Sequence, residues 1–137
     1  MKIIHTNHLS EDAKKIRIEV FMNEQGFQNE FDELDDMSIH FVAYDDEPVA
    51  VCRIYFDHLK NHYVLGRLAV IKNKRKQGYG AKIIEAAKQV INEKGGTSIH
   101  LHAQCQAMPF YQQLGFEAYG EMDYDEDCPH YWMKLTL

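Results

Sequence analysis

The feature that most constrains the fold is a strand–helix–strand pattern in the middle of the chain. An apolar run at 63–71 (YVLGRLAVI) predicts a strand, and apolar residues recur at helical spacing between Gly80 and the Gly95-Gly96 pair. A second, short strand is predicted at 98–103 (SIHLHA). Strands joined by a helix of this length pair in parallel through a right-handed crossover. We therefore expect a mixed α/β sheet with helices packed against it.

Further elements are predicted on both sides of this pattern. Four more strands are expected, over 39–44, 49–56, 116–122 and 130–137. Helices are expected from the N-cap Ser10 to about Gln25 and over 108–114, with an acidic loop or short helix at 27–38. No repeat or linker interrupts the 137 residues, so we expect one domain over residues 1–137.

The composition narrows the class of protein. Hydrophobic residues make up 45% of the chain and charged residues 26%, which is ordinary for a soluble globular protein. The N-terminus has no apolar stretch like that of a signal peptide, and no apolar run approaches the ~20 residues of a membrane span. The three cysteines show no CxxC spacing, which disfavours a disulfide framework or a zinc site. We expect a cytoplasmic protein without a membrane partner.

Acidic residues are concentrated in two segments. EFDELDD (30–36) and EMDYDED (121–127) hold five acids each, which is ten of the 21, and no base. The net charge of −6 makes the chain a poor candidate for binding a phosphate backbone, so we expect no nucleic-acid partner. The two segments could instead attract a cationic amine and form the entrance to a site. Solvated acidic loops are the simpler interpretation of either segment alone.

A basic loop with two glycines separates the first strand of the central pattern from its helix. KRKQGYGAK (74–82) leads into a helix whose first backbone N–H groups lack partners and whose dipole favours an anion. Gly78 and Gly80 allow a tight turn and the close approach of a ligand oxygen. GxxxxGK[ST] and GxGxxG are absent, so this is neither a P-loop nor a dinucleotide fingerprint. The loop favours a pyrophosphate, against the alternative of a helix start with solvated lysines.

Two motifs in this half of the chain resemble those of a known enzyme family. Leu68-Ala69-Val70 followed by Arg75-Lys76-Gln77-Gly78-Tyr79-Gly80 is similar to an apolar strand with an R/Q-x-x-G-x-G/A loop. Gln104-x-x-Ala107-x-x-x-Tyr111-x-x-x-Gly115-Phe116 is similar to N-x-x-A-x-x-x-Y-x-x-x-G-F, with only Gln104 departing from it. Both patterns are those of the GNAT superfamily of acetyl-CoA-dependent N-acetyltransferases. Glu24-Gln25, Asp32-x-x-Asp35, His40 and Pro129-His130 also resemble a bacterial branch of small GNAT proteins.

The resemblance implies a fold, a coenzyme and a reaction. The fold would be a central, mostly antiparallel sheet in which one parallel strand pair opens for the coenzyme, with helices on both faces. Acetyl-CoA would be the cosubstrate, without a metal, and its acetyl group would pass directly to a primary amine of a small molecule. Homodimers are common in the family, so the resemblance also implies a possible homodimer. The residues implied to bind the coenzyme are Leu68, Ala69, Val70, Arg75, Lys76, Gln77, Gly78, Tyr79, Gly80, Ala81, Gln104, Ala107, Phe110 and Tyr111.

The chemistry of acetyl transfer selects the remaining candidates. A lysine-like amine with a pKa of about 10.4 is almost fully protonated at pH 7, so a base must help to deprotonate it. Tyr111 is the expected general acid for the leaving thiolate, because a phenol is protonated at this pH. No single base stands out. The catalytic candidates on the amine side are His130 and Glu24, and the other possible bases are Asp32, Asp35 and His40. The residues expected to contact the acceptor are Asp32, Asp35 and His40.

Another interpretation of the chain stays open. The chain could be a non-catalytic acyl-CoA-binding sensor or interaction module, although the presence of Tyr111 favours the enzyme. His100 and His102 alternate on one face of a predicted strand, but without a third ligand in view they do not predict a metal site.

Overall fold

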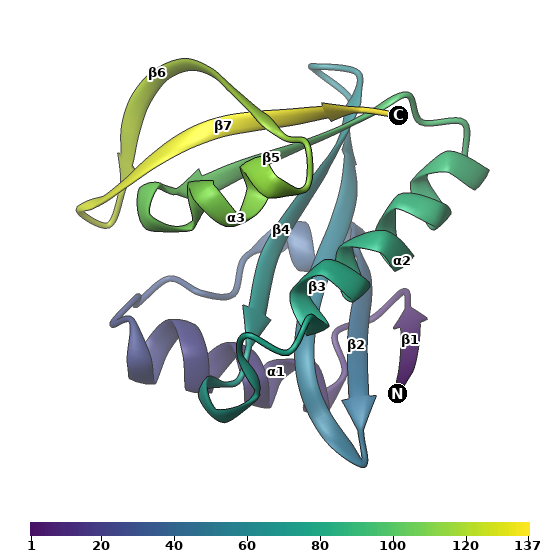
Figure 1. Ribbon diagram of the computed structural model, residues 1–137, viewed down its shortest axis with the longest axis vertical. Coiled ribbons are helices and arrows are strands. Elements are labelled where there is room, and N and C mark those ends of the chain that lie inside the picture. The colour runs from purple at the N-terminus through teal and green to yellow at the C-terminus, as the bar shows by residue number, and fades with distance from the viewer.

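Seven strands form a single sheet in the computed structural model, which describes residues 1–137 (Figure 1). The strands are β1 (Lys2–Thr6), β2 (Ile39–Asp45), β3 (Glu47–Asp57), β4 (His62–Val70), β5 (Ser98–Gln104), β6 (Glu117–Asp125) and β7 (Cys128–Thr136). Their order across the sheet is β1-β2-β3-β4-β5-β7-β6, and every neighbouring pair is antiparallel except β4 and β5. The predicted mixed sheet with one parallel pair is therefore confirmed.

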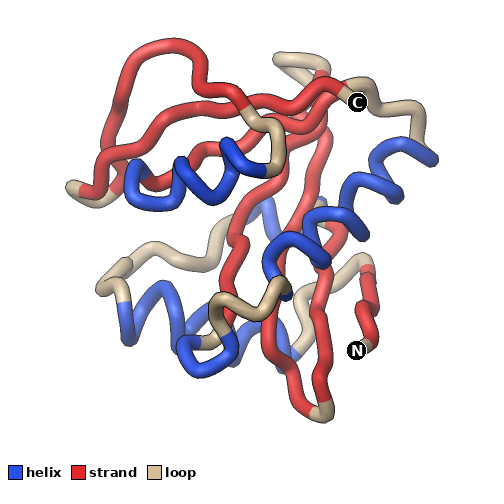
Figure 2. The backbone as a smooth tube through the Cα atoms, viewed as in Figure 1, coloured by secondary structure: helices blue, strands red, loops and turns tan.

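Helices cover both faces of this sheet, as predicted (Figure 2). α1 (Glu11–Arg17) continues as a π-helix, η1 (Ile18–Glu24), whereas α2 (Tyr79–Glu93) and α3 (Met108–Gln113) are α-helical throughout. Three short 3-10 turns complete the helical elements: η2 (Glu33–Met37), η3 (Lys72–Lys74) and η4 (Cys105–Ala107). None of the helices is long and apolar enough to cross a membrane.

The alternation of side chains along the strands explains the two-sided packing. Phe41 and Ala43 of β2 belong to the larger apolar core, which includes Ile83 of α2. Val42 lies between them in the sequence and packs with Ile16 of α1 in a second core. Successive side chains of a strand point to opposite faces of the sheet. The continuous apolar run of β2 is therefore buried from both sides.

The parallel pair β4–β5 is joined only near its start. Tyr63 pairs with Ile99 and Val64 with His100, and no later residue of β4 pairs with β5. Beyond this point the two strands diverge, as Figure 1 shows. β4 is irregular at Arg67, whose φ of 54° lies in the left-handed region. The divergence leaves one side of the second half of β4 without a neighbouring strand.

The structure differs from the predicted elements mainly at the chain ends. β1 was not predicted because its sequence, KIIHT, is short, mostly exposed and without an alternating apolar pattern. It forms the sheet edge by pairing with β2 from Lys2–Tyr44 to Thr6–His40. The last two strands are longer than predicted and meet at a tight turn in which Glu126 has a φ of 49°. The second acidic segment is therefore part of a β-hairpin and not a loop.

Candidate active site

Two cavities occupy the opening between β4 and β5. The outer cavity, of about 370 Å³, lies between the end of β4, the loop that precedes α2, and α3. The inner cavity, of about 160 Å³, is lined by the middle of β4, by η1 and the loop after it, and by parts of β5 and β7. Four residues line both cavities: Gln25, Leu68, Ala107 and Tyr111. A ligand that fills the outer cavity therefore reaches the inner one beside Tyr111.

The N-terminus of α2 forms one end of the outer cavity. Gly78 is the N-cap with a φ of 88°, a conformation that favours glycine. The backbone N–H groups of residues 77–81 make no hydrogen bond within the protein. A Cβ on Gly80 would lie 3.1 Å from the Phe110 ring, so a larger residue has little room there. Free N–H groups at the positive end of a helix fit an anion such as a pyrophosphate.

The residues predicted to bind the coenzyme gather in the same place. All of them line the outer cavity except Gln77 and Gln104. Gln104 lines the inner cavity instead, and its side-chain nitrogen donates to the amide oxygen of Gln25 at 2.8 Å. The phenol of Tyr79 donates to the Asp45 carboxylate, so its hydroxyl points toward the β2–β3 turn. Tyr79 therefore contributes its backbone N–H to the cavity end while its side chain anchors the helix.

Arg75 and Glu24 are bound to each other. Two guanidinium nitrogens of Arg75 donate to the two carboxylate oxygens of Glu24, each at 2.6 Å, and Nε donates to the carbonyl oxygen of Val70 at 2.8 Å. The hydrogen bond from Arg75 holds the pKa of Glu24 below its usual value. Glu24 lines neither cavity. This geometry is that of a clamp between η1 and the loop before α2, not that of a base facing an amine.

Tyr111 lies where the two cavities meet. Its side chain is 9% exposed, and its ring packs against Phe110 and Phe116 with centroid separations of 5.1 and 5.8 Å. The Tyr111 hydroxyl makes no hydrogen bond to another side chain or to the backbone. Burial raises the pKa of the phenol, so the hydroxyl keeps its proton at neutral pH. Tyr111 can therefore give a proton to a group placed between the cavities.

His102 and His130 line the inner cavity, and their stacked rings have centroids 4.5 Å apart. Nδ1 of His130 lies 2.8 Å from the carbonyl oxygen of Cys128, which only accepts hydrogen bonds. In the neutral ring, Nδ1 therefore carries the hydrogen and Nε2 is free to accept a proton. Nε2 of His102 lies 2.6 Å from the Asp123 carboxylate, which by the same reasoning leaves its Nδ1 free. The structure places His102, which was not among the predicted bases, beside the predicted candidate His130.

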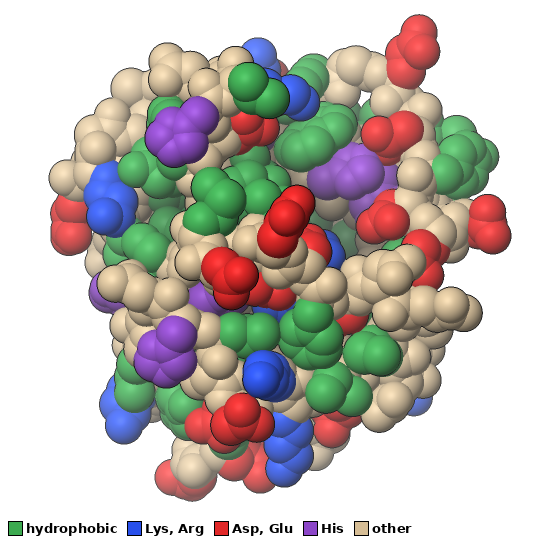
Figure 3. All heavy atoms as spheres, turned by 180° about the vertical axis from the view of Figure 1, so that it is seen from behind, with side chains coloured by type: hydrophobic (Ala, Val, Ile, Leu, Met, Phe, Trp, Pro, Cys, Tyr) green, Lys and Arg blue, Asp and Glu red, His purple; other side chains and the backbone are tan.

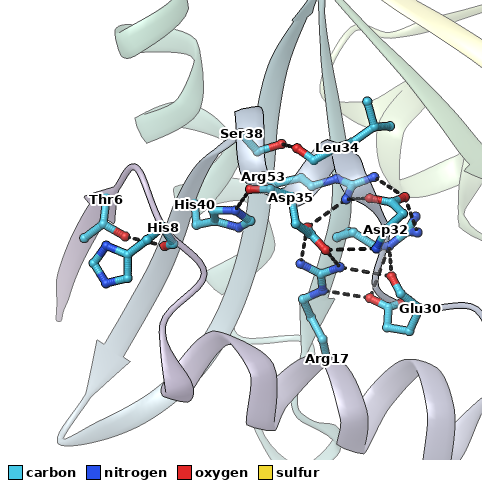
Figure 4. A network of polar contacts seen from close by, with 11 residues as sticks. Thr6, His8, Arg17, Glu30, Asp32, Leu34, Asp35, Ser38, His40 and Arg53 are labelled. Atoms are coloured by element: carbon cyan, nitrogen blue, oxygen red, sulfur yellow. Dashed lines mark hydrogen bonds and ion pairs between the residues drawn. The ribbon is translucent and has the colours of Figure 1, made fainter.

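Asp32, Asp35 and His40 lie outside both cavities, in a network of polar contacts in which Asp35 and His40 are buried and Asp32 is exposed (Figure 4). Ion pairs connect six side chains of alternating sign into a closed ring, with separations of 2.6–3.2 Å between neighbours. In order around the ring these are Arg17, Glu30, Arg67, Asp32, Arg53 and Asp35. Three positive and three negative charges make the ring neutral.

The ring controls the ionisation of its acids. Burial acts to raise the pKa of Asp35, but hydrogen bonds from Arg17 and Arg53 outweigh it and bring the pKa to about 2. For Glu30 burial is the stronger effect, and its pKa is raised. Nε2 of His40 lies 2.9 Å from the carbonyl oxygen of Asp35, and burial lowers the pKa of this histidine.

This arrangement differs from the expectation that Asp32, Asp35 and His40 contact the acceptor. Asp35 is 6% exposed and His40 is 2% exposed, so neither can meet a substrate directly. Arginines from α1, β3 and β4 bind three of the five carboxylates of the 30–36 segment, those of Glu30, Asp32 and Asp35, and neutralise them. These three acids therefore hold the loop before β2 in place and do not form a negative entrance.

The second acidic segment, 121–127, keeps its charge. None of its five acids forms an ion pair with lysine or arginine, and Asp125 lines the inner cavity. Glu126 accepts hydrogen bonds from the backbone N–H groups of Gln28 and Asn29, both at 2.9 Å, which ties the hairpin to the loop after η1. In the view from behind, acidic side chains lie around histidines at the upper right (Figure 3). An ammonium group that approaches from this side meets negative charge.

Several residues of the site were not among the predicted site residues. Gln25 lines both cavities, and Arg67 and His102 line the inner one. The alternation of β5 gave a signal for His102, because it shares a strand face with Gln104. Its partner Asp123 lies 21 residues later, so no local spacing relates the two. No group of three or more His, Cys, Asp or Glu side chains comes together in a way that could hold a metal ion.

Comparison with known proteins identifies the family. Residues 6–137 match the family model described as Acetyltransferase (GNAT) domain. The uncharacterized N-acetyltransferase YjcF of Bacillus subtilis (strain 168) is 37% identical over 127 residues, which cover 89% of each chain. The crystal structure of an acyl-CoA N-acyltransferase from Pseudomonas aeruginosa is similar, with a TM-score of 0.82 and 27% identity over 97% of each chain. ElaA of Escherichia coli also has a TM-score of 0.82, with 25% identity over 98% of this chain and 99% of its own. The chain therefore belongs to the GNAT acetyltransferase family and is an acyl-CoA-dependent N-acetyltransferase.

Proposed function

We propose that this chain transfers the acetyl group of acetyl-CoA directly to the primary amine of a small molecule. The observation that carries the proposal is the meeting of the two cavities at Tyr111. The outer cavity ends at free N–H groups, as a pyrophosphate requires, and the inner cavity contains two imidazoles. When bound, acetyl-CoA supplies a thioester, whose carbonyl carbon is attacked and whose sulfur is the leaving group.

The protein would hold the coenzyme mainly with its backbone. The N–H groups of residues 77–81 would bind the pyrophosphate, with Lys76 and Arg75 at its rim. Leu68 and Val70 would offer main-chain groups to the pantetheine arm, which lies beside β4 like an added strand. The divergence of β5 supports this role, because it leaves that side of β4 without a strand partner. Gln104 would contact the acyl end of the arm, since it lines the inner cavity.

The two cavities would divide the proton transfers between them. Nε2 of His130 would take the proton that the amine nitrogen loses as it bonds to the acetyl carbon. The sulfur would leave with the electron pair of the C–S bond and take the proton of Tyr111. His102, held by Asp123, is a second acceptor beside His130 and is the more exposed of the pair. Glu24 would support the loop before α2 through Arg75 without touching the amine.

The test is a pair of conservative substitutions with binding and turnover measured separately. Tyr111→Phe and His130→Gln should each lower kcat by roughly 10²–10⁴-fold, because each removes one proton transfer. Acetyl-CoA affinity by calorimetry should stay near that of the wild type. Tyr124→Phe is the matched control, because Tyr124 is 64% exposed and lines neither cavity. Full activity of Tyr111→Phe would remove this residue as the acid.

A wild-type protein that binds acetyl-CoA but releases no thiol with any amine would support the alternative, a non-catalytic acyl-CoA-binding module. The single domain over 1–137, the cytoplasmic location, the homodimer and the lack of nucleic-acid and membrane partners stay predictions.

A further inference from the structure

Arg67 lines the inner cavity and has one guanidinium nitrogen without a hydrogen-bond partner. Its Nε donates to the carbonyl oxygen of Glu30 at 3.1 Å and its Nη2 to the Asp32 carboxylate at 3.2 Å. Its Nη1 makes no hydrogen bond and is accessible to solvent. In Arg17 and Arg53, by contrast, both Nη atoms bind acids of the ring. The ring therefore leaves one set of N–H donors free, on a residue that lines the cavity.

The backbone holds this nitrogen in position. The φ of 54° at Arg67 is a conformation that non-glycine residues rarely adopt, and it occurs beside Gly66 where β4 departs from β5. Such residues persist where the surrounding structure fixes them, and they cluster at ligand sites. Here the contacts to Glu30 and Asp32 also fix the side chain. Nη1 is thus placed before any ligand arrives.

One other charge of the inner cavity is open. Asp125 lines the cavity, is exposed and makes no ion pair. Glu30 also lines it, but its carboxylate binds Arg17 and Arg67 and the residue is 4% exposed. An acceptor in this cavity of about 160 Å³ therefore meets one free cationic edge and one free carboxylate. Because the ring is neutral, its own acids do not repel an anion at Arg67; the unpaired negative charge beside this cavity is that of the 121–127 segment.

We propose that the acceptor is a compact zwitterion, an amine that also carries a carboxylate. Nη1 of Arg67 binds the carboxylate through charge-assisted hydrogen bonds, while Asp125 attracts the ammonium group toward His130. A polyamine would place a second ammonium group against Arg67, and the small cavity favours an amino acid over a multi-ring amine. This inference rests on the proposed acetyl transfer.

The test compares acids with matched amides. Glycine, β-alanine and 4-aminobutyrate are each paired with their primary carboxamide, and alanine and methionine with alaninamide and methioninamide. Thiol release from acetyl-CoA gives kcat/KM for each member. For the best pair we expect the acid to exceed its amide by about tenfold or more, which is the worth of one charged hydrogen bond. The chain length of the best acid then reports the distance between the amine and Arg67.

Arg67→Gln should remove this preference. The variant should lower the ratio of kcat/KM for the best acid to kcat/KM for its amide by about tenfold or more, mainly through KM for the acid. Turnover of the amide shows that the variant is folded. Arg67→Lys, which restores a cation but not the planar fork, should recover part of the loss for the acid only.

The outcomes separate the two proposals. If amides are acetylated as well as acids, or if Arg67→Gln affects both members equally, the zwitterion is excluded while acetyl transfer stands. If no member is acetylated, the proposed acetyl transfer to these amines is wrong. The role of Arg67 in binding a carboxylate is then tested separately, by calorimetry in the presence of CoA. N-acetyl-β-alanine and N-acetylmethionine must then bind more tightly than their amides in the wild type and not in Arg67→Gln; equal affinity overturns the inference.

Discussion

The two acidic segments of this chain look alike in the sequence and have opposite roles in the structure. Segments 30–36 and 121–127 each hold five acids and no base. In the first, three acids are bound by three arginines in a closed and largely buried ring. In the second, no acid meets a lysine or an arginine. The second segment keeps all five charges beside the inner cavity, whereas three acids of the first fix the fold around the site.

The number of charged residues in a segment therefore does not predict the electrostatic field that the segment produces in the folded protein. What decides is whether partners of opposite sign lie within reach after folding, and here they come from α1, β3 and β4. A buried ion pair that loses one partner leaves an uncompensated charge in a medium of low dielectric, which is strongly destabilising. An exposed charge that loses its neighbour is simply solvated. Substitutions in the two segments should therefore act on different properties of the protein.

The largest effect is expected from Arg17→Met, which opens the ring. Arg17 is 1% exposed and bonds to both Glu30 and Asp35, so its removal leaves two buried carboxylates short of a partner. We expect the free energy of unfolding to fall by about 3–5 kcal/mol. Urea denaturation followed by circular dichroism measures it.

Lys14→Met on the same helix is the matched control for this loss. Lys14 is partly exposed and makes a single ion pair with Glu11 at 3.5 Å, so its loss should cost less than about 0.5 kcal/mol. A cost below about 1 kcal/mol for Arg17→Met would show that the ring contributes little and that the comparison between the segments fails.

A smaller effect is expected in the pH dependence of Asp35. Its pKa falls from 3.8 to about 2 on folding. An acid whose pKa is lower in the folded state stabilises the protein above the unfolded pKa and loses this contribution as the pH falls through the folded value. The contribution is therefore complete above about pH 4 and lost toward pH 2, with a size of about 2 kcal/mol. The free energy of unfolding of Asp35→Asn, compared with that of the wild type at pH 6, 4 and 3, measures it.

The gap between the two proteins should be widest at pH 6 and should narrow as the pH falls below 4. A gap that stays constant over this range would mean that Asp35 does not titrate with a lowered pKa. Asp12→Asn provides the comparison for a carboxylate outside the ring, because this half-buried acid accepts a hydrogen bond only from the Tyr44 hydroxyl.

The sequence was informative where function depends on the backbone. The central strand–helix–strand pattern, the glycines before α2 and the order of the two motifs selected residues of which most line one cavity, because each signal depends on local periodicity and turn chemistry. The helix start at Ser10 was correct for the same reason, since its side chain accepts from the Ala13 N–H at 3.2 Å. β1 was missed because an exposed edge strand has no apolar alternation to reveal it.

The sequence could not predict which charges meet. Arg17 and Asp35 are 18 residues apart and Arg67 and Asp32 are 35 apart, so no helical or strand spacing relates them. Glu24 and Arg75, 51 residues apart, form a clamp for the same reason. Assigning Asp32, Asp35 and Glu24 to the acceptor side followed from the plausible rule that acids attract amines. The rule fails where a folded chain provides the cations itself.

The smallest effect, and the sharpest contrast with the ring, is expected from neutralising the hairpin. The triple variant Glu121→Gln, Asp125→Asn, Asp127→Asn removes exposed charges that have no ion-pair partner, so the free energy of unfolding should stay nearly constant. At low salt, kcat/KM should fall by roughly 3–10-fold for an amide acceptor, which carries a net positive charge, and by less for the matched zwitterion, because a long-range field acts on net charge. The loss should shrink toward none at about 0.5 M salt, where the Debye length is only a few ångströms.

The control is the double variant Glu33→Gln, Asp36→Asn, which removes two exposed acids of the first segment that lie outside the ring. It should change kcat/KM less than the hairpin variant does. An equal loss in both variants would mean that net charge alone acts on the acceptor and that the position of the hairpin beside the inner cavity does not matter.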